Sequence, residues 1–505
     1  MIKKCIWLSG FIFLSILTSI DISSAQNLDT LNLAKDLRNT GKVKESLALL
    51  KKYFENNKKE LYAGWIYADA LYKNKKYKES SEIYAETINR YPKNTDLRLD
   101  FAIKSTEIGN LKAATYHLNK LNHNLSKDYK FAVKKTLAKV YFWQGDYERS
   151  LSNINAALNI YKNDEESLNL KSDIKKIQSN WMKIDASYMD NNQPLTRMSP
   201  DIEMGFYHNS RLSTDIGINT SFYSKDYKLH TGGEIDGKVI YRFLNAKASL
   251  ELGIGLIRLP SNEYNIGTSF SLKKKLFKNS EFQANYKYAP YLATKASIDK
   301  KVMQNIFEMS FERKNTDSWM GKLSFTLNNF PSVANSQYTL SSWVVSPSLK
   351  LSKFRFRLGY GFNYSDSKKN SFNSTLSLNE LLALKDTAII INGAYDPFFS
   401  PKNQKIHSVI GMISYNPFFN TNIGVSINYG AIASSDIPYL FLDNNKNGVL
   451  QINRSYFHNK YNPLEINGFI SYELPNEVSV KAYYMYQKTS YYTSYVTGLT
   501  TKFLF

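Results

Sequence analysis

The chain has 505 residues, 14% of them aromatic, and its mean hydropathy of −0.40 excludes a bundle of membrane-spanning helices. This length exceeds what one compact core usually serves, so we expect two or more domains. Lysine and arginine outnumber aspartate and glutamate by 65 to 44, and the net charge of +21 favours anionic partners such as lipopolysaccharide or an acidic glycan. A lysine-rich proteome would give the same excess without any functional meaning.

The first 25 residues predict a secretory signal peptide that is cleaved after Ala25. Lys3 and Lys4 form a positive start, an apolar run follows over residues 6–20, and small residues precede the cleavage position. The only cysteine, Cys5, lies before the apolar run. The mature chain is therefore expected to have no disulfide and no cysteine-ligated metal, and an exported protein is not expected to bind nucleic acid.

Residues 26–180 have a helical pattern that repeats four times. The segments GKVKESLALL, KKYKESSEIY, GNLKAATYHL and GDYERSLSNI begin 34, 34 and 36 residues apart, at Gly41, Lys75, Gly109 and Gly145. Each segment carries a small residue five positions on, where one helix of a pair would pack closely on the other. This pattern resembles the tetratricopeptide repeat, which implies an α-solenoid that binds partners and carries no chemistry of its own. A capping helix is expected within 163–181.

Beyond Trp181 the period changes to two and stays so to the last residue. In KFRFRLGYGFNY (353–364) every even position is large and apolar or aromatic, and every odd position is charged, polar or glycine. Either a soluble sandwich or a transmembrane barrel would give such strands. Short joints recur along this half at intervals that fit hairpins, and they predict 16 to 18 strands. The two-faced last strand, TGLTTKFLF, ends in Phe505 and resembles the assembly signal of outer-membrane barrels.

The predicted fold is therefore an N-terminal α-solenoid followed by a C-terminal antiparallel transmembrane β-barrel over residues 181–505. In the opening strand the phenylalanines would face lipid, and Arg355 and Arg357 would face the lumen. The polar lumen candidates are Lys353, Arg355, Arg357, Asn363, Gln283, Lys287, Asn428, Lys481 and Gln487.

Catalytic and metal motifs are largely missing from the sequence. No HExxH pair, GxSxG elbow, Walker loop or dinucleotide fingerprint is present, and we expect neither an enzyme nor a cofactor. DNNKNG (443–448) matches the first half of a calcium loop through Asp443, Asn445 and Asn447, but Arg454 stands where a bidentate glutamate is needed. A turn at the tip of a long outer loop is the alternative interpretation.

A solenoid of this kind fused to a C-terminal barrel resembles the outer-membrane exporters of poly-N-acetylglucosamine and cellulose. The barrel half is also similar to the YaiO-type outer-membrane proteins. The resemblance implies that the repeats receive a polymer or dock periplasmic or inner-membrane proteins, while the lumen passes a glycan outward. Two alternatives stay open: a membrane anchor that recruits a secretion or motility machine, and a barrel enzyme that acts on lipid or glycan.

Overall fold

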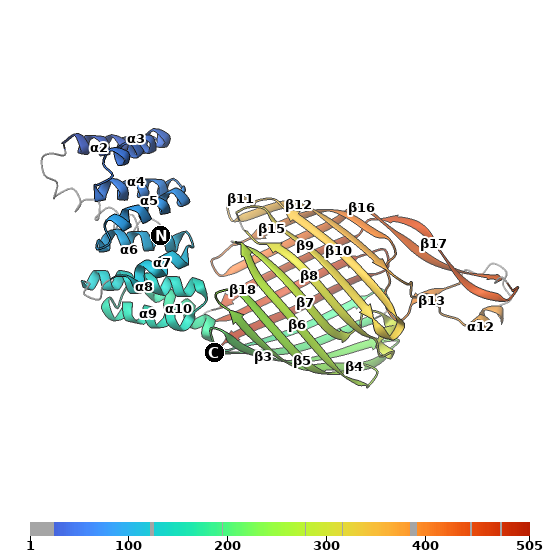
Figure 1. Cartoon of the computed structure of the whole chain (residues 1–505). Helices are drawn as coiled ribbons and strands as arrows, with labels where there is room; N and C mark the ends of the chain where they lie inside the picture. Colours follow the sequence, from blue (N-terminus) through green and yellow to red (C-terminus); the bar gives the residue numbers. More distant parts are fainter. Residues whose placement is uncertain are drawn as a thin grey trace. The chain divides into compact units, whose positions relative to one another are not determined.

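The computed structural model divides the chain into two compact units, one ending at Ser172 and one beginning at Asp173 (Figure 1). The predicted signal peptide lies outside the described residues, apart from Ala25. No described helix has the length and apolarity needed to cross a membrane. The structure describes residues 25–121, 126–193, 195–277, 279–315, 317–383, 391–444, 447–474 and 477–505.

The first unit is built from helix pairs, as the repeats predict. Each pair joins an A helix to a B helix, in the order α2–α3, α4–α5, α6–α7 and α8–α9, and α10 follows. The bounds are α2 Ala25–Asn39, α3 Val43–Asn56, α4 Leu61–Lys73, α5 Tyr77–Arg90, α6 Thr95–Glu107, α7 Leu111–Asn119, α8 Lys127–Gln144, α9 Tyr147–Ile160 and α10 Glu165–Gln178.

The first residue of each repeated segment ends an A helix in a left-handed conformation. Gly41, Gly109 and Gly145 have φ of 80°, 82° and 81°, and Lys75 takes the same role with φ of 64°. The N–H of the next residue bonds back to the carbonyl five positions earlier, for example Lys42 to Leu37 at 2.8 Å. This is the helix-ending motif that glycine favours because it has no Cβ. The repeated glycine therefore sets the turn between helices A and B.

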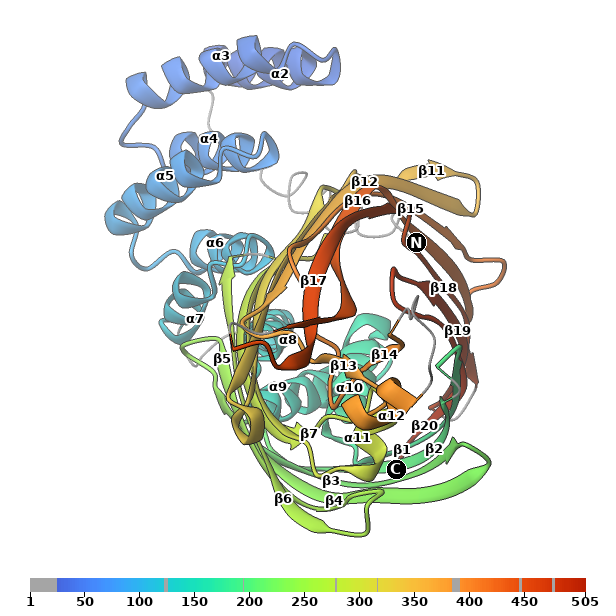
Figure 2. The ribbon, with the colours of Figure 1, turned by 90° about the vertical axis from the view of Figure 1, so that its right-hand side faces the viewer.

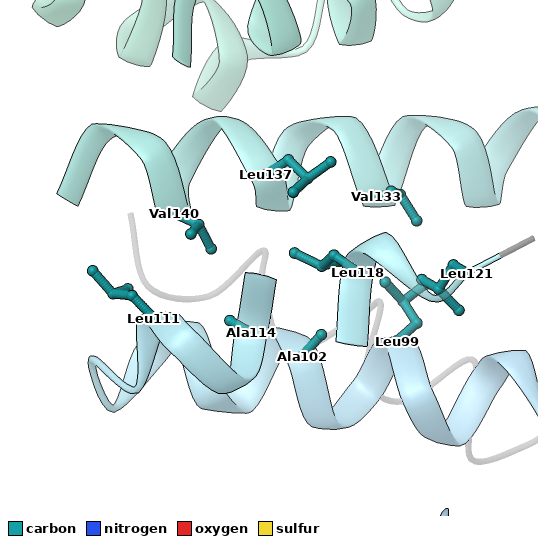
Figure 3. Close-up of a cluster of buried hydrophobic side chains, with 9 residues drawn as sticks. All are labelled: Leu99, Ala102, Leu111, Ala114, Leu118, Leu121, Val133, Leu137 and Val140. Atoms are coloured by element: carbon teal, nitrogen blue, oxygen red, sulfur yellow. The ribbon is translucent and has the colours of Figure 1, made fainter. Parts of the chain in front are cut away.

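The small residue of each segment brings helix B against helix A. Ser46 is buried and donates a hydrogen bond to the carbonyl of Ala34 at 2.6 Å, and the equivalent serines of the second and fourth repeats bond to equivalent alanines at 2.7 Å. In the third repeat, Ala114 packs against Ala102 without a hydroxyl, inside the cluster drawn in Figure 3. The close approach of the helices therefore depends on residue size, and the serine hydroxyl adds a bond where it is present.

The second unit is a closed antiparallel β-barrel of 16 strands. It closes where β1 pairs with β20, from Trp181 opposite Leu504 to Asn191 opposite Ser494. Two further strands extend the sheet: β11 (Leu349–Leu351) pairs with the start of β12, and β17 (Leu450–Tyr461) pairs with the outer part of β16. The barrel strands are β1 Trp181–Asn191, β2 Leu195–Asn209, β3 Leu212–Lys225, β4 Lys228–Phe243, β5 Ala248–Arg258, β6 Tyr264–Phe277, β7 Ser280–Pro290, β8 Met303–Arg313, β9 Met320–Phe330, β10 Asn335–Val345, β12 Phe354–Ser367, β15 Gln404–Tyr415, β16 Thr421–Asn444, β18 Leu464–Leu474, β19 Val478–Lys488 and β20 Thr493–Leu504.

The two ends of the barrel differ. The turn end, where β1 begins and β20 ends, has mostly short connections, such as 352–353 and 416–420. The loop end carries the long connections 291–302 and 368–403. Further elements in the connections and at the sheet edges are α11 Lys295–Asp299, η3 Pro331–Val333, β11 Leu349–Leu351, β13 Phe372–Ser374, α12 Leu378–Ala383, β14 Gly393–Tyr395 and β17 Leu450–Tyr461.

The exterior of the barrel is apolar. On β12, the side chain of Leu358 is 69% exposed and that of Tyr360 is 47% exposed, and exposed leucine, isoleucine and phenylalanine recur around the ring. A water-soluble sandwich would bury this face, whereas a lipid bilayer solvates it. The barrel is therefore of the outer-membrane type, and the prediction that the phenylalanine face of 353–364 points outward is confirmed by its position.

Candidate functional site: the barrel interior and its mouth

The interior face of the barrel carries most of the polar positions singled out in the sequence. Because side chains alternate across a strand, the residues between the exposed apolar ones point into the barrel. Pairings confirm the shared face, since Asn363 lies opposite Ser341 and Asn428 lies opposite Ile410. Lys353 differs from the others, because it lies in the tight turn before β12. The candidates on the interior face are Gln283, Lys287, Arg355, Arg357, Asn363, Asn428, Lys481 and Gln487.

Two of these cations are tied to the backbone of the turn end. The guanidinium of Arg357 donates to the carbonyls of Ser346 at 2.8 Å, Ser318 at 3.3 Å and Asn315 at 3.4 Å. The ammonium of Lys353 donates to the carbonyl of Pro417 at 2.6 Å. Arg357 therefore holds neighbouring turns together, a role that strand alternation alone could not reveal.

The interior wall also carries carboxylates that the sequence reading did not select. Glu203 on β2 pairs with Lys183 of β1 and, at 3.4 Å, with Lys238 of β4. Asp185 accepts a hydrogen bond from the hydroxyl of Tyr483 at 3.2 Å. The signal was present, because these acids occupy the polar positions of alternating strands. Charges of both signs face one another here, so this part of the wall is polar without being strongly of one sign.

At the loop end, the segment 395–400, which we call the strap, contacts the loop between β7 and β8. The ring of Phe398 is 2% exposed and stacks on that of Phe330, with centroids 3.9 Å apart and planes 5° from parallel. Thr294 donates to the carbonyl of Pro397 at 2.5 Å, and the N–H of Phe399 donates to the hydroxyl of Tyr291 at 3.1 Å. Burial raises the pKa of Tyr291 to about 12, so this phenol stays protonated and neutral.

The strap also contacts the connection between β19 and β20. The rings of Phe399 and Tyr491 have centroids 4.0 Å apart, and those of Tyr395 and Tyr491 lie 5.6 Å apart. Eight strands separate this connection from the β7–β8 loop in either direction around the ring, because β8, β9, β10, β12, β15, β16, β18 and β19 lie between them. The strap therefore joins opposite sides of the barrel. Figure 2, which looks at the loop end, shows α11, β13, β14 and α12 within the outline of the ring.

The β7–β8 loop folds inward to meet the strap. Ile298 of α11 is fully buried against Leu195 and Tyr223, which line the interior face of β2 and β3. Asp299 and Lys295 at the ends of α11 pair with Lys225 and Asp226 at the β3–β4 turn. The mouth is thus bridged by loops that are anchored on several sides.

Arg454 of β17 anchors the 368–403 connection, which contains the strap. Its guanidinium donates to the carbonyl of Asn370 at 3.0 Å and to that of Phe372, next to the β13–β14 pair. From the sequence alone, Arg454 is notable only because it stands where a calcium loop needs a glutamate. Asp443 is the last residue but one of β16, and Gly448 has φ of 75° in the turn that follows, which fits the turn interpretation. Asn445 lies outside the described residues. Over the described residues, no group of three acidic, histidine or cysteine side chains could hold a metal ion.

The solenoid contains its own buried charge network, between α4 and α6. The ammonium of Lys104 lies between the carboxylates of Asp69, 3.0 Å away, and Asp100. Trp65 and Tyr84 both donate to Asp100 at 2.6 Å. Burial alone would lower the pKa of Lys104, but the two carboxylates outweigh it and raise that pKa. The lysine stays charged, and the network joins the second and third repeats.

Comparison with solved structures finds similar barrels and similar solenoids at low identity. The chain covers 99% of a structure described as a bacterial polysaccharide outer membrane secretin, over 65% of its own length, with 11% identity and a TM-score of 0.47. It covers 98% of a loop-deletion mutant of OmpT, an outer membrane protein of Vibrio cholerae, again over 65% of its own length, with 9% identity and a TM-score of 0.32.

The helical unit has similar structures of its own. A tetratricopeptide repeat protein from Parabacteroides merdae matches 29% of this chain with 15% identity and a TM-score of 0.26, and 56% of that protein is covered. The sequence matches no family model and no curated protein. By its own helix pairs and paired strands, the chain combines tetratricopeptide-like repeats with an outer-membrane-type barrel.

Proposed function

We propose that this protein is an outer-membrane channel that passes a polysaccharide from the periplasm to the cell surface. The observation that carries the proposal is a closed barrel with an apolar exterior and an interior wall of amides, hydroxyls and paired charges. Sugar hydroxyls exchange hydrogen bonds with such a wall at many weak sites, so a chain can slide along it without being trapped.

The solenoid would lie in the periplasm and guide the polymer or dock periplasmic partners. The chain runs from α10 into β1 at the turn end. In outer-membrane barrels the short turns face the periplasm and the longer loops face outward. By this rule the polymer enters at the turn end, and the strap must move aside for it to leave at the loop end.

The proposal is tested by deleting the gene in its host and measuring polysaccharide at the surface and in the periplasm. We expect surface polymer to disappear while synthesis continues, so that polymer accumulates in the periplasm. A variant that lacks residues 27–180 should insert its barrel and export poorly. Normal surface polysaccharide together with loss of a secreted protein or of motility would contradict the proposal and favour the anchor for a secretion or motility machine.

A further inference from the structure

The outer part of β16 extends beyond the barrel wall and forms a two-stranded ribbon with β17. The neighbouring strand β15 pairs with β16 only as far as Lys405 opposite Ser434. From Ser435 to Asn444, β16 pairs with β17, which runs from Leu450 to Tyr461. The described part of the 368–403 connection adds an isolated bridge between Ile391 and Leu440 and a backbone hydrogen bond from Asp436 to Lys402. Figure 1 shows this hairpin extending past the other strands of the barrel.

One face of the ribbon continues the interior face of the barrel wall. At the rim, Ala433 lies opposite Ile406 on the interior face, and Ile432 lies opposite His407 on the exterior face. The pairing with β17 then proceeds without a register shift. Because side chains alternate, Ile437, Tyr439 and Phe441 belong to the same face as Ala433. Along the strand, these residues therefore continue the interior row of β16 beyond the rim.

This face carries three aromatic rings in sequence, Tyr439, Phe441 and Phe457, which we call the ladder. Tyr439 is 44% exposed and Phe457 is 49% exposed. The ring centroid of Tyr439 lies 5.9 Å from that of Phe441 and 6.3 Å from that of Phe457. The side chains between the rings on β17 are Asn453 and Ser455, so this stretch of the face has amide and hydroxyl groups and no charge.

The opposite face of the ribbon is covered by the chain itself. Leu440 is 6% exposed and packs with Leu381 of α12 and with Ile391. Arg454 is on the same face and bonds to the carbonyls of Asn370 and Phe372. Contacts on the Leu440 face therefore hold the ribbon in position, while the rings of the ladder on the other face stay exposed.

We propose that the ladder is a stacking platform for the pyranose rings of an uncharged glycan as it leaves the barrel. This inference rests on the proposed function and adds the substrate class at one site. The C–H groups on the flat side of a pyranose ring pack against the electron-rich face of an aromatic ring. The ring separations are comparable to the length of one sugar unit, and the amide and hydroxyl groups between them suit sugar hydroxyls.

Lipid is a poor occupant for the ladder. Tyr439 lies five residues beyond Ser434, which places it about 17 Å past the last pairing with β15 along the strand. An aromatic girdle of a barrel lies at the membrane interface, next to the paired wall. A face without charge is also unsuited to binding a polyanion, which needs arginine or lysine.

The test measures oligosaccharide binding by the full-length mature protein in detergent micelles, by calorimetry. The probes are cellohexaose and chitohexaose, with hexagalacturonate as the acidic comparison. The double variant Tyr439→Leu with Phe457→Leu keeps apolar bulk but removes two flat rings. We expect the neutral probes to bind the double variant at least about ten-fold more weakly than the wild type, and hexagalacturonate to bind neither well. Tyr360→Leu, on the lipid-facing side of β12, is the matched control and should bind like the wild type.

Two results would overturn the inference. One is that neither neutral probe binds the wild type, and the other is that the double leucine variant binds as well as the wild type. A change in oligomeric state of that variant, with unchanged sugar binding, would assign the ladder to contact between copies instead. Export by the deletion strain is scored separately, so a ladder that fails this test leaves the channel proposal standing.

Discussion

Replacing Phe398 by alanine tests whether the strap closes the barrel. Phe398 is 2% exposed, stacks on Phe330 and packs with Val302 and Tyr291, all of which belong to other connections or strands. Truncating a buried phenylalanine costs roughly 3 to 5 kcal/mol. These contacts exist only while the strap is in place. The substitution should therefore destabilise the state in which the strap bridges the mouth, relative to the open state. At about 1.4 kcal/mol per factor of ten, the open population should rise roughly a hundred-fold or more.

The assay is single-channel conductance of the full-length mature protein in planar bilayers, supported by entry of a bulky antibiotic into cells. We expect the wild type to be mostly closed and Phe398→Ala to show frequent or long openings. Phe418→Ala is the matched control, because Phe418 is 73% exposed in the turn between β15 and β16. Unchanged conductance of a correctly folded Phe398→Ala barrel would refute the reasoning, and so would an equal effect of the control.

Three further predictions concern the faces of the barrel and the stability of the solenoid. Phe356→Arg places a charge on the lipid-facing side, but Phe356 is the third residue of β12 and lies near the turn end, so the cost should be below the roughly 2 to 4 kcal/mol of a midplane position. Arg355→Phe should leave folding largely intact, and the reverse order of heat-modifiable barrel yield would contradict this. Lys75→Gly should raise the melting temperature of the helical circular-dichroism signal by stabilising the turn by about 1 kcal/mol, because φ there is 64°; Lys78→Gly, within α5, should lower it. Burial and the charge of Arg98 lower the pKa of His117 from 6.5 to about 4. Between these two pH values the unfolded chain binds a proton at this histidine and the folded chain does not. The free energy of unfolding should therefore fall as the pH drops from 6.5 to about 4. His117→Phe should make the free energy of unfolding less dependent on pH in this range, and an unchanged pH dependence would contradict the assignment to His117.

The fold could be predicted because each half obeys one strong periodicity. The repeated glycine, or Lys75 in its place, and the small residue that follows reflect requirements that recur in every repeat, namely a left-handed turn and a close helix contact. In the barrel, one face must meet lipid and the other must not, so alternation persists from Trp181 onward. The predicted range of 16 to 18 strands contains the observed 16.

The mouth could not be predicted because its contacts join residues far apart in the sequence. Thr294 meets Pro397 and Phe399 meets Tyr491, and no local pattern marks these pairs. The ladder depends on a register shift in the pairing with β15, between His407 and Ser408, which decides the face to which Tyr439 belongs. Periodicity gives the two faces of a strand, but a single bulge exchanges them.

The two ends of the barrel are held by different means, and this bears on how lumen charge can be probed. At the turn end, Arg357 bonds to three backbone carbonyls and Lys353 to a fourth. At the loop end, the strap is held largely by ring packing and a few side-chain bonds. Reversing the charge of Arg357 would therefore leave three carbonyls without their donor and disturb the turns themselves. Arg355 lies on the same interior face, and its charge acts on Asp317 in the β8–β9 turn without a hydrogen bond from its side chain among the described residues. Charge reversal at Arg355 alone thus separates the electrostatics of the lumen from the integrity of the wall.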